Sequence, residues 1–491
     1  MTAGTTTVHP SMNPGSLTAG MPTSIDRSTR FPVLLFVGLG TAWLIVGSLL
    51  ATIAAFALIL PGWFDWAAFL NYGRVQPAGM NALIYGWASQ VGIGLGIWLT
   101  TRLSGVELRH HTLLVCGAVI WNLALLVGVL SILAGGSTSL QFLEMPSGIT
   151  PVLLIAYALI AAWAVVMFRL RRPGSVVYVS MWYLLAAFLA FPWLYATAQI
   201  FLVWNPVPGS ATGPIHGWFT NGLIGLWLVP LALGMIYYFI PKGVGRPVHS
   251  YGLAVFGFWS LLVLSNWSGL NQLVGGPVPV WLVSVSVVAT ILLVIPTIAV
   301  GSNLHLTAVG ATGVKSDGTM PFFVVGFWAY AIYTVINALA VLPSASSVFQ
   351  FTMLAPGQTT LIVGGLVTLT FFGAIYSLLP RLTGLTVAFP GLRPVVLWVS
   401  VAALGMIITC ALVGGLTQGF SMRDAEVTFI FSQKFAAPYR VVVALSELTL
   451  LVINVLFAAT FAVTLARPVV ASKRVERVDP PTRTPGEVVS V

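Results

Sequence analysis

Histidine, cysteine and acidic side chains are the residues that could hold a metal ion or move a proton, and this sequence contains few of them. Its 491 residues include six histidines, two cysteines and 11 acids. Cys116 and Cys410 both lie inside apolar runs, so they predict neither a disulfide framework nor a C-x-x-C redox pair. We expect both cysteines to be small packing residues in the core.

The histidines all fall in polar segments or near the ends of apolar runs: His9, His110, His111, His216 before the sixth run, His249, and His305 just past the eighth. A haem or a copper ion inside a helical bundle is held by imidazole nitrogens that project from helix interiors toward a shared centre. The sequence provides no such ring of histidines. We therefore expect these side chains to be interfacial or capping residues.

Glu447 is the one acid that falls well inside an apolar run, because the other ten acids lie in loops or tails. It follows Arg440 by seven residues, about two helical turns, so the two side chains share roughly one face. Acids inside a membrane are often functional. Two interpretations stay open: a proton-handling or ion-binding carboxylate, or a hydrogen-bonded acid that faces the bundle near the outer interface.

Long apolar helices must position these residues, because 58% of the chain is hydrophobic, 7% is charged and the mean hydropathy is +0.98. Soluble proteins carry about 25% charged residues, so a soluble enzyme, a DNA-binding module and a disulfide scaffold are excluded. The pattern predicts an all-α integral membrane protein. Its twelve expected spans lie near residues 33–60, 80–103, 112–134, 151–170, 178–203, 217–240, 251–273, 279–301, 320–342, 359–380, 394–417 and 440–466.

The lysines and arginines provide an independent test of this count, because they gather in the cytoplasmic loops of membrane proteins. In the twelve-helix scheme 17 of the 21 basic residues lie on the side of the N-terminus and four lie opposite. A missed helix would exchange the sides of all later loops, so we expect both termini in the cytoplasm. The net charge of +10 thus reflects topology and gives no reason to expect nucleic acid.

The chain divides into a membrane domain and two polar tails. We expect residues 1–30, rich in Thr, Ser, Pro and Gly, to form a disordered cytoplasmic tail. Residues 31–467 should form the twelve-helix domain. The basic segment 468–491 should be disordered in the cytoplasm or lie against anionic lipid.

Several motifs resemble those of one membrane-protein family. Gly234-Met235-Ile236-Tyr237-Tyr238-Phe239-Ile240-Pro241-Lys242, with Arg246-Pro247-Val248 and Ser250-Tyr251 after it, resembles the junction of the sixth and seventh helices in the catalytic subunit of C-family (cbb-type) haem-copper oxidases. Three further segments agree in order and spacing: Tyr178-Val179 with Trp182-Tyr183, Trp267-Ser268-Gly269, and Gly373-Ala374-Ile375-Tyr376 with Leu379-Pro380-Arg381. The resemblance covers roughly residues 33–466 and implies a twelve-helix haem-copper-oxidase-like bundle.

The resemblance also implies where copper and haem would bind, and every one of these positions carries another residue. The family's copper-binding histidines, one in the sixth helix and a pair in the seventh, fall at Asn221, Asn271 and Gln272. The low-spin haem ligand of the second helix falls at Gly79, and the two haem ligands of the tenth helix fall at Gln358 and Thr360. The redox-active tyrosine of the family falls at Ser265.

An amide side chain has the hydrogen-bonding reach of imidazole but no basic lone pair for iron or copper. We therefore expect these positions to be vestigial and the chain to bind neither haem nor copper. Four of them are amides, which suggests a retained hydrogen-bonded network, whereas drift around a wet leftover cavity is the alternative. Bulky side chains, lipid or water should fill the vacated haem pockets, because large voids are costly.

Three functions stay open. The first, which we favour, is a cytochrome c oxidase subunit I-like protein without haem and copper sites, acting as a non-catalytic structural or assembly subunit of a respiratory or redox complex in the bacterial inner membrane. The resemblance implies other membrane subunits and a membrane-anchored cytochrome c as its partners. The second is a functional terminal oxidase, from cytochrome c to oxygen with proton pumping, whose ligands we have not placed. The third is a transporter or channel that reuses the polar interior.

Overall fold

A computed structural model of the chain describes residues 23–64, 66–173, 177–311 and 318–467. Within these ranges the regular structure is entirely helical. Twelve segments of the described chain are long and apolar enough to cross a membrane, which confirms the predicted fold class and number of spans. An apolar stretch of about 20 residues covers the hydrocarbon core as a helix, which satisfies every backbone polar group internally.

The twelve spans follow one another with short connections. In chain order they are α1 (Ser24–Ala57); α2, η3 and α3 (Tyr72–Asn81, Ala82–Ala88, Ser89–Ser104); α4 (His111–Ala134); α5 (Thr150–Arg169); α6 and η4 (Val179–Ala198, Gln199–Trp204); η5, α7, η6 and α8 (Gly209–Ala211, Thr212–Gly222, Leu223–Leu228, Val229–Val244); α9 and η7 (Tyr251–Trp267, Leu270–Leu273); α10 and α11 (Val280–Leu292, Val294–Ala308); α12 (Met320–Ala340); α14, η8 and α15 (Leu354–Thr360, Leu361–Thr368, Leu369–Thr383); α16 (Leu392–Arg423); and α17 (Phe429–Ala466). Three short helices lie in the connections: η1 (Pro61–Trp63), η2 (Ala68–Leu70) and α13 (Pro343–Phe349).

The first span begins earlier than the sequence predicts. Residues 24–30, which we assigned to the N-terminal tail, form the first two turns of α1. A capping box starts the helix there: the Asp26 amide donates to Thr23 Oγ1, and the Thr23 amide donates to Asp26 Oδ2, both at 3.2 Å. Trp98 Nε1 also donates to Asp26 Oδ1 at 2.9 Å, which ties this end to the bundle. The rest of the expected N-terminal tail and the segment 468–491 lie outside the described residues.

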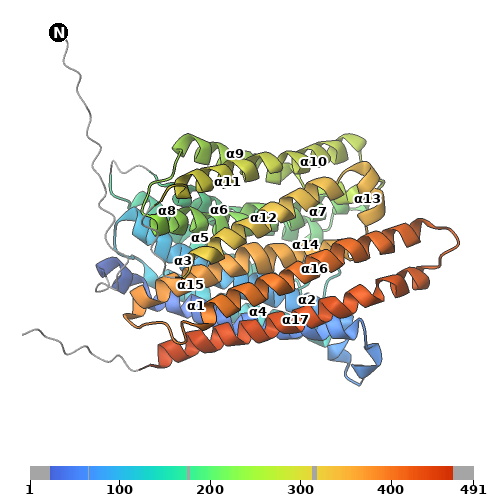
Figure 1. The fold of residues 1–491 in the computed structure, drawn as a ribbon, viewed down its shortest axis with the longest axis horizontal. Coiled ribbons are helices and arrows are strands. Elements are labelled where there is room, and N and C mark those ends of the chain that lie inside the picture. Colours follow the sequence, from blue (N-terminus) through green and yellow to red (C-terminus); the bar gives the residue numbers. More distant parts are fainter. Residues whose placement is uncertain (1–22, 65, 174–176, 312–317, 468–491) are drawn as a thin grey trace, which may run out of the picture.

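Three spans form the centre of the bundle and nine surround them. The apolar windows of the second, sixth and tenth spans are 94%, 83% and 89% buried, whereas those of the other nine are 33–50% buried. In Figure 1 the helices run side by side along the long axis, and α1 begins at the end where α17 finishes. The three central spans are also those to which the family resemblance assigns most metal ligands.

Each central span contains a π-helical segment near its middle. These segments are η3 (Ala82–Ala88), η6 (Leu223–Leu228) and η8 (Leu361–Thr368), and a fourth, η4, ends the fifth span. A π-helical turn widens the helix by one residue per turn, and such turns occur often at functional sites. The backbone is therefore irregular at the level where the three central spans face one another.

Small residues let the first two spans approach closely. An ideal Cβ added to Gly40 would lie 2.6 Å from Val91 Cγ2, and one added to Gly86 would lie 2.5 Å from Trp43 Cβ. A Cβ on Gly47 would lie 2.7 Å from Leu83 Cγ. Glycines at helix contacts allow backbones to approach closely in membranes, so α1 is held tightly against η3 and α3.

Candidate functional site

The copper position in the sixth span lies in α7 and its side chain bonds to the end of α9. Asn221 Nδ2 donates to the Ser265 carbonyl at 2.9 Å and to Ser268 Oγ at 2.6 Å. The tight contact depends on Gly269, which adopts φ +103° and whose ideal Cβ would lie 2.5 Å from Asn221 Cβ. Asn221 therefore serves as a hydrogen-bonding support for the turn that follows α9.

The other two copper positions lie in that turn, in η7. Asn271 is half-buried and its backbone amide donates to Ser286 Oγ at 3.0 Å, while Gln272 is exposed and its carbonyl accepts from Gln350 Nε2 at 2.8 Å. These bonds use the backbone of Asn271 and Gln272. In the described part of the chain the amides of Asn221, Asn271 and Gln272 do not bond to one another, so the suggested amide network is not formed as such.

The haem-ligand position of the second span is tightly packed against α1. An ideal Cβ on Gly79 would lie 3.1 Å from Leu50 Cβ and 3.2 Å from the Ala51 amide nitrogen. Both neighbours belong to α1, and one of them is backbone that cannot rotate away. The first span thus closes over the position at which the family presents an imidazole.

The two haem-ligand positions of the tenth span lie in α14, immediately before η8. Gln358 is half-buried, and its buried Nε2 atom has no hydrogen-bond partner. Thr360 is half-buried one residue before the π-helical segment. The preceding Gly357 packs against α16, since its ideal Cβ would lie 2.3 Å from Ala411 Cβ.

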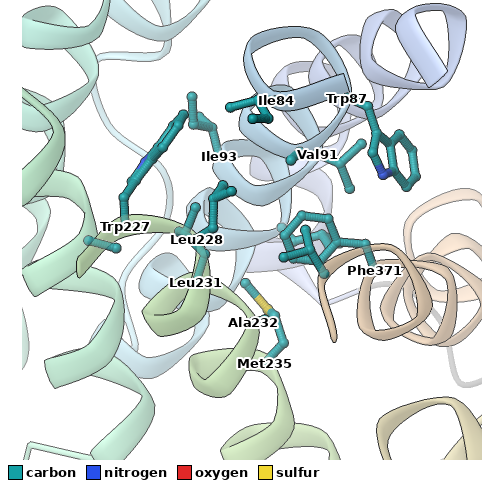
Figure 2. Close-up of a cluster of buried hydrophobic side chains, with 14 of the residues drawn as sticks. Ile84, Trp87, Val91, Ile93, Trp227, Leu228, Leu231, Ala232, Met235 and Phe371 are labelled. Carbon is teal, nitrogen blue, oxygen red and sulfur yellow. The ribbon is translucent and has the colours of Figure 1, made fainter. Parts of the chain in front are cut away.

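Large apolar side chains fill the space between the three central spans. Figure 2 shows Trp87 and Trp227 on opposite sides of a cluster in which Phe371 reaches toward the second and sixth spans. All of these labelled residues are fully buried: Ile84, Trp87, Val91, Ile93, Trp227, Leu228, Leu231, Ala232, Met235 and Phe371. At Gly92 an ideal Cβ would lie 2.9 Å from Leu231 Cδ1 and 3.1 Å from Phe371 Cζ, so a methyl group there would require these side chains to shift. Bulky residues are one of the fillings that the sequence led us to expect.

A small polar cavity lies beside the copper position. It is bordered by α7, η6, α9, α10 and α12, and its volume of about 20 Å³ is enough for a single water molecule. Its polar lining consists of Asn221, Ser265, Thr290, Tyr330, Tyr333, Thr334 and Asn337. Ser265, at the position of the family's tyrosine, is buried on α9 and places a hydroxyl at this wall.

The sequence reasoning missed a buried carboxyl close to the second span. Glu144 lies in the loop between α4 and α5, is 7% exposed, and accepts from Asn81 Nδ2 at 2.8 Å. The same Nδ2 atom donates to the Pro77 carbonyl at 2.8 Å, and Tyr85 donates its hydroxyl to the Phe142 carbonyl. The loop between α4 and α5 and the second span are thus joined by polar contacts just past Gly79. In the sequence, the position of Asn81 inside an apolar run was the one indication that a polar partner lies there.

A second missed group is a hydrogen-bonded chain of one indole and two amide side chains across three spans. Trp43 Nε1 donates to Asn122 Oδ1 at 2.8 Å, and Asn122 Nδ2 donates to Gln90 Oε1 at 2.8 Å. These residues belong to α1, α4 and α3, and Gln90 is fully buried. Such bonds between spans satisfy polar groups that lipid cannot. Because these residues are neither charged nor histidines, the positions of charged residues and histidines in the sequence did not point to them.

Five of the six histidines are described, and four of them are exposed at helix ends: His110, His111, His249 and His305. His216 is half-buried in α7, inside the sixth span rather than before it, and its Nε2 lies 3.2 Å from the Gln141 carbonyl. His305 likewise lies within α11, because that span extends to Ala308. No group of three or more His, Cys, Asp or Glu side chains that could hold a metal ion occurs among the described residues. Cys410 is buried as expected, but Cys116 is exposed on α4, so its assignment to the core was wrong.

Glu447 lies on α17 at the seam with α1. It is half-buried, and Thr52 Oγ1 donates to its backbone carbonyl at 3.4 Å. Arg440, two turns away, is hydrogen-bonded to Gln433 on the same helix. No residue of α17 lines the cavity beside the copper position in α7, so Glu447 does not belong to that site.

The family model described as cytochrome C and quinol oxidase polypeptide I matches residues 31–471. Cytochrome c oxidase subunit 1 of Rhodobacter capsulatus is 26% identical over 424 residues, which cover 81% of this chain and 77% of that protein. The Cbb3-type cytochrome c oxidase subunit CcoN1 of Stutzerimonas stutzeri is 24% identical over 418 residues, with coverages of 82% and 88%.

The solved structures show the same fold. A haem-copper terminal oxidase dimer determined by cryo-electron microscopy superposes with a TM-score of 0.71 at 16% sequence identity. The match covers 90% of this chain and 84% of that one. At this identity the likeness concerns the arrangement of helices alone.

Proposed function

This chain belongs to the family of cytochrome c and quinol oxidase polypeptide I, and within that family we propose that it has lost its haem and copper sites and acts as a non-catalytic structural or assembly subunit of a redox membrane complex. It is a multi-pass membrane protein with the fold of an oxidase subunit I. We place it in a bacterial inner membrane with both termini in the cytoplasm, on the distribution of basic residues and the bacterial sources of its relatives.

One observation carries the proposal: no position that the resemblance assigns to a metal ligand holds an imidazole, thiolate, thioether or phenol side chain. Gly79 is packed against the backbone of α1, and Gly92, which lies between the central spans and is not a ligand position, is packed against Leu231 and Phe371. Both amide hydrogens of Asn221 are donated to residues at the end of α9 and in the turn after it. Haem iron requires axial ligands such as histidine, methionine, cysteine or tyrosine, so these residues do not fit the group.

A functional terminal oxidase is the second candidate, and family membership is the observation that favours it. It would need imidazoles or other ligands that converge between the central spans. Four of the five described histidines instead lie at helix ends or in connections, and His216, in α7, lies against the Gln141 carbonyl. A transporter is less favoured, because the cavity beside Asn221 holds about one water molecule and is lined by uncharged groups.

The test is the cofactor content of the full-length chain purified in detergent, with a cbb-type relative purified alongside as the control. We expect no Soret band, and haem and copper each below about 0.1 per chain, because an interior without axial ligands retains neither. The relative should show both in stoichiometric amounts under the same conditions. One haem or one copper per chain would refute the proposal and favour the terminal oxidase.

A further inference from the structure

A line of polar residues runs along one face of α17. Gln433, Arg440, Glu447 and Asn454 follow one another at intervals of seven residues. Seven residues make about two helical turns, so these side chains share one face of the helix. Most other residues of α17 are apolar or carry only a hydroxyl, Lys434 excepted, so this line gathers most of the strongly polar side chains of the span on one side.

The inner part of the polar line is covered by α1. Asn454 is 8% exposed and its Nδ2 donates to Ser48 Oγ at 2.7 Å. One step along, Thr52 Oγ1 donates to the Ser48 carbonyl of its own helix at 2.8 Å and to the backbone carbonyl of Glu447 at 3.4 Å, and it does not bond to the Glu447 carboxyl. Since α1 ends at Ala57, it provides no further helical cover toward Arg440 and Gln433.

The outer part of the line is left half-buried and incompletely paired. Within the described residues the Glu447 carboxylate has neither a hydrogen bond nor an ion pair, and Arg440 has its neighbour Gln433 as its hydrogen-bond partner. The Tyr72 side chain, at the start of α2, interacts electrostatically with Arg440. Of the twelve spans, α17 has the smallest buried share of its apolar window, at 33%.

An acid and a base at this depth call for partners, because charged side chains in lipid pair with one another or with backbone groups. Lipid chains offer no donor to Glu447. A second copy of the chain, related by a two-fold axis along the membrane normal, would bring Glu447 against Glu447 and Arg440 against Arg440 at the same depths, and so would offer no base to Glu447 and no acid to Arg440. A different helix with complementary groups meets both requirements.

We propose that Gln433, Arg440 and Glu447 form the docking line for a transmembrane helix of another subunit. That helix presents a basic or hydrogen-bond-donating side chain to Glu447, and an acidic or accepting side chain to Arg440 two turns nearer the end of the bundle opposite the termini. It continues the packing that α1 already makes with Asn454. The assignment goes beyond the proposed function and stands whether or not the interior binds haem.

Photo-crosslinking in the intact complex tests the occupant. A photoreactive phenylalanine analogue is placed at position 447 and, as a control, at position 445, where Leu445 is 52% exposed on the outer face of the same helix. From 447 we expect an adduct to a transmembrane peptide of another subunit with a basic or donor residue within one turn, and from 445 adducts to lipid alone. Lipid alone at 447, or a second copy of this chain, overturns the proposal.

Charge reversal supplies an independent measurement on the same complex. Folded Glu447→Lys should lose the crosslinked subunit on purification by at least about tenfold, while Glu447→Gln should retain most of it, because an amide still accepts a hydrogen bond. Replacing the partner's donor by glutamate should restore binding to Glu447→Lys. Unchanged retention in folded Glu447→Lys overturns the assignment. If Glu447→Lys does not fold, the identity of the adduct formed from position 447 decides whether another subunit docks here.

Discussion

Among single residues, Glu144 is the buried carboxyl that lies outside the membrane-spanning segments. Its burial raises the pKa of the carboxyl above the ordinary value of 4.5, although the hydrogen bond from Asn81 lowers it. The native state therefore binds the proton more tightly than the unfolded chain does. Stability must fall as the pH rises from the unfolded pKa toward the native one, and it levels off above the native pKa.

Glu144→Gln keeps an acceptor for Asn81 and removes the ionisation, so it should abolish this slope. We expect the difference between its melting temperature and that of the natural chain to increase, in favour of the variant, as the pH rises from 5 to 8. Each unit of pKa difference between the native and unfolded states is worth about 1.4 kcal/mol. Thermal unfolding in detergent across this range measures the effect, with the exposed Glu107→Gln as control. Parallel profiles for the natural chain and Glu144→Gln would show that burial does not perturb this carboxyl.

Residue types at the candidate site were readable from the sequence, but their contacts were not. The replacement of histidine by Asn221 and Gln358 follows from motif positions alone. The bond between Asn81 and Glu144 joins residues 63 apart, and that between Asn122 and Gln90 joins residues 32 apart, so no local pattern announces either. Long-range polar pairs of this kind are a property of the packed bundle.

At the scale of elements, hydropathy located all twelve spans because burial in lipid demands a continuous apolar stretch. The ends were less well defined, because caps and surface helices decide them. The capping box at Thr23 and Asp26 starts α1 seven residues before the expected boundary. The π-helical segments η3, η6 and η8 left no signal, since they depend on how neighbouring spans pack rather than on composition.

Close packing between the first two spans can be measured with two glycines of the same helix. Gly40→Ala would force a Cβ to 2.6 Å from Val91 Cγ2, whereas Gly38→Ala meets nothing within 4 Å. Both changes raise helix propensity equally, so their difference isolates the packing term. We expect Gly40→Ala to lower the free energy of unfolding by about 1–3 kcal/mol relative to Gly38→Ala, as in overpacked cores. If the two variants were equally stable in chemical denaturation, the first and second spans would be able to move apart enough to admit the Cβ at little cost in free energy.

At the scale of the whole molecule, the bundle is packed around its own side chains. Trp87, Val91, Trp227 and Phe371 are fully buried between the central spans. Ring contacts extend this core outward: Phe372 stacks on Phe457 of α17 at 3.8 Å between ring centroids. If the fold were built around a bound macrocycle, the macrocycle would occupy the space that these side chains fill. Its removal would then leave a large void, which is costly.

This packing predicts that the chain folds without haem. Produced in a host that cannot make haem, the full-length protein should reach the same yield in the membrane and the same melting temperature, within about 2 °C, as the protein from a haem-replete host. Ligands that bind only the native state stabilise it by mass action, so a haem-binding relative should lose stability in the deficient host. Thermal unfolding of both proteins from both hosts provides the comparison. A marked loss in this chain, like that expected of the relative, would mean that a porphyrin completes its interior, and that the apolar cluster between the second, sixth and tenth spans rearranges to admit it.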